Sequence, residues 1–291
     1  MDLAVGVQKA INYVEDHLLD ELEYDNIAKE VNVSSYHFQR IFHILSGFTL
    51  GEYIRNRRLS LAASELQSSE CKIIDVALKY GYETPESFSR AFERFHGVLP
   101  SAAKEKGVEL KSFSRLSIKV ILEGGSVMDY RVEEMEGFRL LGKVEKQFMN
   151  NVQAGKFWDR CINDGTLNAL TEYSTSPEKE HIGIADGSSY DGESYLYYIV
   201  TPYSGDFVPD GYIIKELPAR TWIKFRCVSF GLKDTADMEL YRRIYSEFFP
   251  TSDYEPAEYQ LEVYPYGNPY IDGRSYKGNL AEVWIAVRKK Q

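Results

Sequence analysis

Long hydrophobic runs are missing from this sequence. No stretch approaches the roughly 18–20 consecutive apolar residues that a membrane-spanning helix requires. The N-terminal stretch MDLAVGVQKAINYVEDHLLDELE has acidic residues in an amphipathic spacing, which is not the pattern of a signal peptide. We therefore expect a cytoplasmic protein without a membrane partner.

Cysteine and histidine are scarce and scattered. The three cysteines lie far apart, form no CxxC pair and are odd in number, which argues against a disulfide framework and against a zinc site. The five histidines have no ligand spacing with them. No trio of nucleophile, base and orienting residue is recognisable either. We expect no metal, no cofactor and no catalytic residue, and hence a protein that is not an enzyme.

An excess of positive charge is also absent. The net charge is −10, and residues 1–113 alone contain 13 Lys and Arg against 17 Asp and Glu. The overall charge therefore gives no general attraction to nucleic acid. A nucleic-acid-binding function has to depend on a local basic surface.

The periodicity of the apolar residues divides the chain into two parts. Up to about residue 107 they recur at helical spacing, and from about residue 112 they alternate as in strands. RLSIKVIL at 115–122 predicts the first strand, and helical segments near 152–171 and 234–249 interrupt the others. Residues 130–140 line up with residues 212–222. We predict a multidomain protein: an all-α domain at 1–107, a linker at 108–111, and an α+β domain at 112–291 of two pseudo-twofold strand-helix-strand units.

A short arginine-bearing helix is repeated within the first part. SYHFQRIFHILSG at 35–47 is matched by ESFSRAFERFHG at 86–97. Each copy follows another helix and a turn, at Asn32 or Gly81, and TLGE at 49–52 is a capping box that begins a connecting helix. The pattern predicts tandem helix-turn-helix units at about 24–47 and 73–97. Four residues recur fifty positions later, namely Phe38 as Phe88, Arg40 as Arg90, Phe42 as Phe92 and Gly47 as Gly97.

The polar face of each repeated helix has side chains that can read DNA. Arg40 can pair with guanine and Gln39 with adenine, while Tyr36 can contact a thymine methyl group. Two such helices enter successive major-groove faces about 34 Å apart. The alternative is a helical bundle with solvated arginines. The predicted DNA-binding residues are Ser35, Tyr36, Gln39 and Arg40 in the first unit, Thr84, Glu86, Ser87 and Arg90 in the second, and Arg55, Arg57 and Arg58 of the connecting helix as phosphate ligands.

With these motifs, residues 8–106 resemble the DNA-binding domain of AraC/XylS-type regulators. The resemblance rests on IAKEVNVSSYHFQRIFHILSGFTLGEYIRNRRL and IIDVALKYGYETPESFSRAFERFHGVLPSAAKEKG. It implies base reading by the four residues named in the first unit and by Pro85, Glu86, Ser87 and Arg90 in the second. Pro85 and Glu86 depart from the polar, uncharged residues that are common in the family. The resemblance also implies a bacterial transcription regulator, expected to be an activator, whose partners are a double-stranded promoter site and RNA polymerase.

Residues 112–291 resemble the GyrI-like (Rob-type) effector-binding domain. SIKVILEGGSVMDYRVEEMEGFRLLG is similar to its beginning, and LEVYPYG with LAEVWIAV to its end. The resemblance implies a groove between the two strand-helix-strand units that binds a small organic effector, often a hydrophobic cation, with aromatic walls and a buried glutamate. The predicted effector-binding residues are Tyr130, Tyr197, Trp222, Glu262, Tyr264, Glu282 and Trp284.

Strand alternation supports such a site without locating it. Glu282 shares a sheet face with Trp284, and Glu262 shares one with Tyr264. A carboxylate among aromatic rings suits an organic cation. Alternation does not tell which face of the sheet is open. Either carboxylate beside a tyrosine could instead act as the base of a small-molecule hydrolase, or the domain could sequester a protein partner. An effector-controlled DNA-binding regulator remains the function that we expect.

Overall fold

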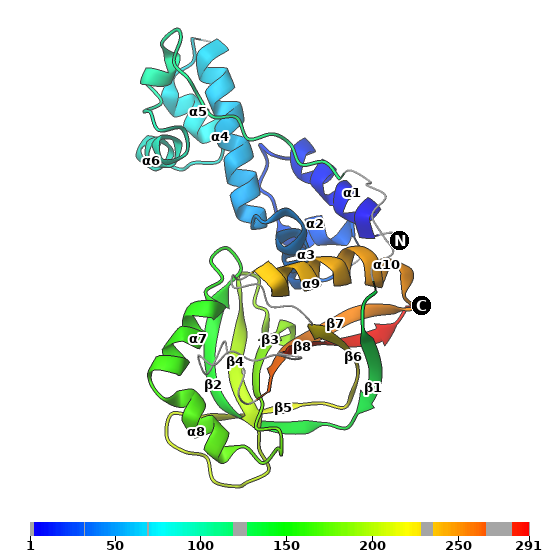
Figure 1. Cartoon of the computed structure of the whole chain (residues 1–291). Coiled ribbons are helices and arrows are strands. Elements are labelled where there is room, and N and C mark those ends of the chain that lie inside the picture. The colour runs from blue at the N-terminus through cyan, green and yellow to red at the C-terminus, as the bar shows by residue number, and fades with distance from the viewer. Residues whose placement is uncertain are drawn as a thin grey trace. The chain divides into compact units, whose positions relative to one another are not determined.

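Figure 1 shows the computed structural model of the chain, which describes residues 3–31, 33–68, 70–118, 127–227, 235–265 and 281–290. The chain divides into two compact units, residues 1–121 and residues 122–291. The described elements of the first unit are all helices, whereas the second contains an antiparallel sheet with helices. The predicted fold class, an all-α domain followed by an α+β domain, is confirmed.

The two repeated helices of the first unit have a capping residue at each end. Ser34 and Thr84 each accept a hydrogen bond from the backbone of the helix that follows, at 3.3 and 3.1 Å. These two helices end at Gly47 and Gly97, whose φ angles of +76° and +84° lie in the left-handed region that favours glycine. The helices are α1 (Leu3–Asp16), α2 (Tyr24–Lys29), α3 (Ser35–Ser46), α4 (Leu50–Ser68), α5 (Ile73–Lys79) and α6 (Pro85–His96), followed by the 3-10 turn η1 (Ala102–Lys104).

The pairs α2–α3 and α5–α6 are the two helix-turn-helix units, and α4 connects them. Gly81 forms the turn of the second unit with φ +80°, while Asn32, its counterpart, lies outside the described residues. The apolar face of each repeated helix is buried. Phe42 of α3 packs with its ring centroid 5.6 Å from that of Tyr53 on α4, and Phe92 of α6 lies in the second core. The same local signals therefore produce the same fold twice.

The described residues of the second unit form an eight-stranded antiparallel sheet in the order β1-β6-β8-β7-β3-β4-β2-β5. The order β2, β4, β3 mirrors the order β6, β8, β7, which confirms the predicted duplication. The first strand of each repeat pairs with the other repeat, because β1 pairs with β6 and β5 with β2. The strands are β1 (Tyr130–Met135), β2 (Phe138–Phe148), β3 (His181–Asp186), β4 (Ser194–Pro202), β5 (Ile213–Leu217), β6 (Arg220–Cys227), β7 (Tyr254–Tyr264) and β8 (Ala281–Lys289).

Helices cover one face of this sheet (Figure 1). Trp158 contacts Tyr264 of β7 at a centroid distance of 5.3 Å, and Tyr245 hydrogen-bonds to Gln260 of the same strand. We call this the helix face. The helical elements are α7 (Ala154–Asn163), α8 (Thr166–Tyr173), the 3-10 turn η2 (Gly187–Ser189), α9 (Thr235–Arg243), the π-helical turn η3 (Ile244–Phe248) and α10 (Phe249–Thr251).

The opposite face of the sheet curves inward on itself. The rings of Phe138 on β2 and Trp222 on β6 lie 6.2 Å apart, although four strands separate these two in the sheet. A flat sheet would hold such residues far apart, since neighbouring strands are about 4.8 Å from each other. We call this the concave face. Its apolar side chains form a core in which Trp222 is fully buried.

Residues 108–118 differ from the prediction. No strand forms at residues 115–118, and the remainder of RLSIKVIL lies outside the described residues. Instead, the backbone N–H of Phe113 donates to Ser60 Oγ at 2.7 Å, and that of Leu116 donates to the Tyr53 hydroxyl at 3.2 Å. The segment expected as a linker thus belongs to the first compact unit, which extends to residue 121. Side chains of α4 supply the hydrogen bonds that a neighbouring strand would otherwise supply.

The described residues show neither a membrane span nor a metal centre. None of the helices among them is long and apolar enough to cross a membrane. Within the same residues, no group of three or more His, Cys, Asp and Glu side chains is placed to hold a metal ion. Burial raises the pKa of the Cys161 thiol to about 11, so this cysteine is a small apolar core residue at neutral pH.

Candidate functional site

The predicted base-reading residues of the first unit lie together on α3. The amide of Gln39 is 3.5 Å from Ser35 Oγ, and the Arg40 guanidinium lies 5.9 Å from the ring centroid of Tyr36. Phe38 points to the core on the other side of the helix. Ser35, Tyr36 and Gln39 are buried, and Arg40 is partly exposed.

The corresponding face of α6 is exposed. Thr84, Glu86, Ser87 and Arg90 are all accessible to solvent, at the N-terminal end and along one side of the helix. Thr84 is also the N-cap, and Pro85 occupies the first turn. Glu86 lies in this turn, where the helix dipole stabilises a carboxylate. Arg90 therefore remains the predicted base-reading cation of the second unit.

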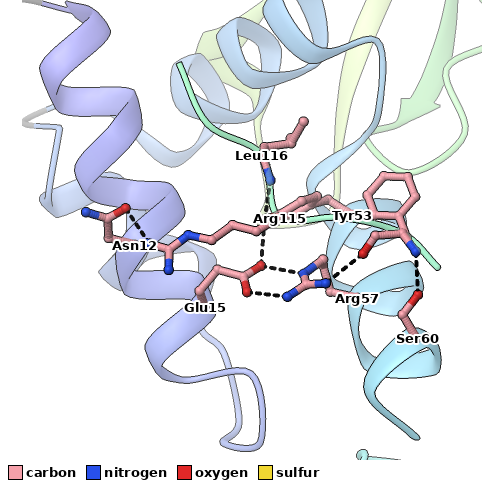
Figure 2. Close-up of polar contacts among 8 residues, drawn as sticks. Asn12, Glu15, Tyr53, Arg57, Ser60, Arg115 and Leu116 are labelled. Carbon is pink, nitrogen blue, oxygen red and sulfur yellow. Dashed lines mark hydrogen bonds and ion pairs between the residues drawn. The ribbon is translucent and has the colours of Figure 1, made fainter. Parts of the chain in front are cut away.

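The three arginines of α4 have different surroundings. Arg55 is exposed, as a phosphate ligand must be. Arg57 is not: its guanidinium forms two hydrogen bonds with the Glu15 carboxylate, both at 2.8 Å, and a third with the carbonyl oxygen of Phe113 at 2.6 Å (Figure 2). The Arg57 and Glu15 side chains are only 13% and 7% exposed. We therefore correct the prediction for Arg57, which joins α4 to α1 and to the segment around Phe113.

Arg58 is likewise committed to internal partners. It donates to the carbonyl oxygens of Leu18 and Asp20 at 2.7 and 2.8 Å, which ties the loop between α1 and α2 to α4. Its guanidinium also lies against Gly81, where a Cβ atom would come within 2.6 Å of Nη1. This arginine thus links the loop between α1 and α2 to the turn of the second helix-turn-helix unit. Of the three arginines of α4, Arg55 is the one for which a phosphate contact is still predicted.

A carboxylate and several aromatic side chains meet on the helix face of the second unit. Glu262 Oε2 accepts hydrogen bonds from the hydroxyls of Tyr197 and Tyr264 at 3.1 and 3.3 Å, and Oε1 accepts one from Tyr241 at 3.4 Å. The indole N–H of Trp158 donates to the Tyr197 oxygen at 2.9 Å. We call these five residues the glutamate cage. Burial and the nearby Glu262 charge hold the pKa of Tyr197 well above its ordinary value, so the hydroxyl stays a donor.

Two members of the glutamate cage were absent from the sequence prediction. Trp158 lies on α7 and Tyr241 on α9, whereas the prediction drew its aromatic residues from strands alone. Phe157, the neighbour of Trp158 in the sequence, is buried in the core, whereas Trp158 is half-buried. Glu262, Tyr264 and Trp158 are each partly exposed to solvent.

The absence of a side chain at Gly183 leaves room for two aromatic residues of the cage. Gly183 on β3 is directly opposite Glu262 on β7 in the strand register. A Cβ atom at this position would lie 2.3 Å from the Tyr197 hydroxyl and 3.1 Å from Trp158. A larger residue would therefore displace the tyrosine and indole that surround the carboxylate.

Glu282 and Trp284 occupy the other face of the sheet. Glu282 is paired with Val263 in the register, and Glu262 with Val283, so the two carboxylates point to opposite faces. Both Glu282 oxygens accept hydrogen bonds from Arg131, at 2.6 and 2.9 Å. Burial would raise the pKa of Glu282, but the hydrogen bonds from Arg131 and from the Trp284 indole outweigh it and lower the pKa. Glu282 is thus neutralised within the protein.

The other predicted effector residues are also separated from the cage. Trp222 is fully buried in the concave core, and the Trp284 ring is covered by the Lys224 ammonium 3.7 Å from its centroid. Tyr130 lies on β1 at the edge of the sheet, where its ring is 4.7 Å from that of Phe248. The structure therefore brings together Tyr197, Glu262 and Tyr264 of the predicted set. We correct the placement of Glu282, Trp284 and Trp222. The pairing of the strands puts these three side chains on the concave face, whereas Glu262 is on the helix face.

Known proteins resemble both units. A helix-turn-helix domain model matches residues 27–106, and a model described as integron-associated effector binding protein matches residues 131–287, more than half of the chain. The HTH-type transcriptional activator AarP of Providencia stuartii is 38% identical over 95 residues, which are 33% of this chain and 70% of AarP.

Two further matches extend the comparison. The transcriptional regulator Rob of Salmonella typhimurium is 30% identical over 159 residues, so that the match spans about half of each chain (54%). A solved structure of SAV2435 bound to tetraphenylphosphonium has a TM-score of 0.47 and 16% identity, and the match covers 55% of this chain and 94% of SAV2435. The two domain matches and the AraC-type relatives show that the chain joins an AraC-type helix-turn-helix domain to a GyrI-like domain. The chain therefore belongs to the family of integron-associated effector binding proteins.

Proposed function

We propose that this protein is a bacterial transcription regulator of the cytoplasm, which binds a specific promoter site and is controlled by a small lipophilic cation. It acts as an activator that recruits RNA polymerase. The observation that supports the DNA-binding part is the duplicated reading helix: α3 and α6 have the same caps, the same buried phenylalanines and an arginine at the same position. The similarity to AarP, which is named a transcriptional activator, supports the direction of regulation.

The glutamate cage supports the proposed class of effector. A carboxylate that accepts hydrogen bonds from three tyrosine hydroxyls is held in place, and indole and phenol rings surround it. An organic cation at 4 Å gains about 4 kcal/mol of Coulomb energy at an effective dielectric constant near 20, before desolvation is subtracted. A ring face adds about 0.5–2 kcal/mol. A neutral molecule of the same shape lacks both contributions.

The effector proposal is tested with tetraphenylphosphonium as the probe. We expect the full chain to bind it in isothermal titration calorimetry, and Glu262→Gln to weaken binding by about tenfold to hundredfold, since the Coulomb contribution is lost. Glu282→Gln is the matched control, because this carboxylate lies on the concave face and is paired with Arg131. Equal loss in both variants would contradict the assignment of the cage. Appearance of a hydrolysis product from an electrophilic ligand, seen by mass spectrometry, would favour the hydrolase alternative.

The DNA-binding proposal needs an operator, which selection from a random duplex library can provide. On that site we expect Arg40→Ala and Arg90→Ala each to cost about 1–3 kcal/mol in fluorescence anisotropy and to relax the preference at one base pair. Lys289→Ala, which removes an exposed charge at the end of β8 in the other unit, is the control. If Arg40→Ala binds the operator as tightly as the wild type does, α3 is not a recognition helix.

A further inference from the structure

The segment from Val108 to Ile118, which we call the strap, is docked on helices α1, α4 and α6 of the DNA-binding unit. Side chains of that unit hydrogen-bond to its main chain at intervals of two or three residues. The contacts are Gln67 Nε2 to Val108 O at 3.1 Å, Lys111 N to His96 Nδ1 at 3.2 Å, Phe113 N to Ser60 Oγ at 2.7 Å, Leu116 N to Tyr53 at 3.2 Å and Ile118 N to Gln8 Oε1 at 2.7 Å. A passive linker needs none of these contacts.

The strap runs from the end of the second helix-turn-helix unit to the helix before the first. It begins beside Gln67 of α4, passes His96, the last residue of the recognition helix α6, follows α4, and ends beside α1, the helix before the first helix-turn-helix unit. Phe113 anchors its middle, with ring centroids 5.1 Å from Phe48 and 6.0 Å from Tyr53. The strap therefore runs beside α4 as a second connection between the parts that carry the two reading helices.

A buried charged network connects the strap to the helices (Figure 2). Glu15 of α1 accepts from Arg57 and from the Tyr53 hydroxyl, at 2.8 and 2.6 Å. Arg57 donates onward to Phe113 O, and Tyr53 accepts from the N–H of Leu116. The same two side chains that join α1 to α4 thus hold two points of the strap. Undocking the strap leaves a guanidinium donor and a hydroxyl acceptor without these partners.

We propose that the strap is a positioning and control element: its docking sets the spacing of the two recognition helices, and its release lowers DNA affinity. The inference rests on the proposed DNA-binding function. The chain leads from Ile118 to the effector-binding unit, so any constraint that this unit transmits along the backbone acts first on the strap. Rigid spacing raises affinity because the DNA then does not have to order the two units.

Hydrogen exchange of the full chain tests the docking. We expect the amide protons of Phe113, Leu116 and Ile118 to be protected in the wild type, and Phe113→Ala and Ser60→Ala to increase their exchange. Ser60→Ala is the milder variant, because it removes one hydrogen-bond acceptor and leaves the ring contacts. Ser114→Ala, an exposed position of the same strap, is the matched control. Strap amides that exchange as fast as an unstructured peptide in the wild type would overturn the proposal.

DNA binding of the same full-length variants tests the consequence. We expect about tenfold weaker operator binding for Phe113→Ala and a smaller loss for Ser60→Ala, with Ser114→Ala unchanged. On operators with one base pair inserted between the two contacted segments, the wild type should bind much more weakly, and the strap variants should discriminate less. General destabilisation lowers binding to both operators alike and does not change this ratio. A wild type that binds no DNA refutes the proposed function, whereas a DNA-binding wild type with an unaffected Phe113→Ala variant refutes only the strap.

Discussion

Arg57 and Arg55 lie two positions apart on α4, and the structure predicts opposite results for their substitution. Arg57→Ala leaves the Glu15 carboxylate, which is 7% exposed, without its bidentate partner. Breaking a buried ion pair by removing one member costs about 3–5 kcal/mol. We expect the lower end, about 3 kcal/mol, because the Tyr53 hydroxyl still donates to Glu15 at 2.6 Å. For a unit of this size the unfolding temperature then falls by roughly 10 °C or more.

Calorimetry and salt-dependent DNA binding of the full chain separate a structural arginine from a phosphate ligand. Each phosphate contact contributes about 0.9 to the slope of log K against log salt. We expect Arg55→Ala to decrease this slope by about 0.9 and to change stability by less than about 0.5 kcal/mol, as exposed sites do. Arg57→Ala should lower the unfolding temperature and leave the slope unchanged. A stable Arg57→Ala protein with a decreased slope would show that Arg57 contacts phosphate and that the reasoning is wrong.

The pH dependence of the same network has a definite sign. Burial raises the pKa of Glu15, but the hydrogen bonds from Arg57 and Tyr53 outweigh burial, and the net effect lowers the pKa below its ordinary value of 4.5. A carboxyl group with a lowered pKa in the folded state stabilises the fold above its unfolded pKa. The contribution should be lost as the pH falls below about 4.5. This loss should be missing in the Arg57→Ala variant, in which the ion pair no longer exists.

Two other positions give predictions of the same kind. Gly183→Ala places a Cβ atom 2.3 Å from the Tyr197 hydroxyl, so it should weaken tetraphenylphosphonium binding by about tenfold and destabilise the fold by about 1–3 kcal/mol through overpacking. Gly155→Ala in α7 is the control, because no atom lies within 4 Å of its Cβ, and it should leave binding unchanged. Unaltered affinity of the Gly183→Ala variant would count against the cage. Burial lowers the pKa of His96 below 6.5, and its Nδ1 accepts the N–H of Lys111. The neutral ring should therefore stabilise the fold fully above about pH 6.5 and progressively less as the pH falls below it, so His96→Gln should flatten the melting temperature between pH 7 and pH 5, and an unchanged profile would contradict this role.

The two helix-turn-helix units were predictable because their signals are local. Ser34 and Thr84 cap the repeated helices, and Gly47 and Gly97 end them, within stretches of about a dozen residues. Such features depend on hydrogen bonds between residues three or four apart, which a sequence displays directly. The duplicated strand pattern of the second unit was visible for a similar reason, since side chains alternate from one residue to the next.

The sites depended on contacts between distant residues. The alternation of side chains along a strand indicated that Glu262 shares a face with Tyr264 and that Glu282 shares one with Trp284. Only the pairing of β7 with β8 showed that these two pairs lie on opposite faces of the sheet. Trp158 and Tyr241 joined the cage because α7 and α9 pack on the same face as β7.

Spacing along α4 likewise could not distinguish Arg57 from Arg55. The partner of Arg57, Glu15, lies 42 positions away, and its third contact comes from Phe113, two residues before the predicted strand. The sequence by itself determined which elements form and where they end, because those energies are local. Tertiary structure decided which charges are paired and which remain available, because that depends on the partners that folding brings within 3 Å.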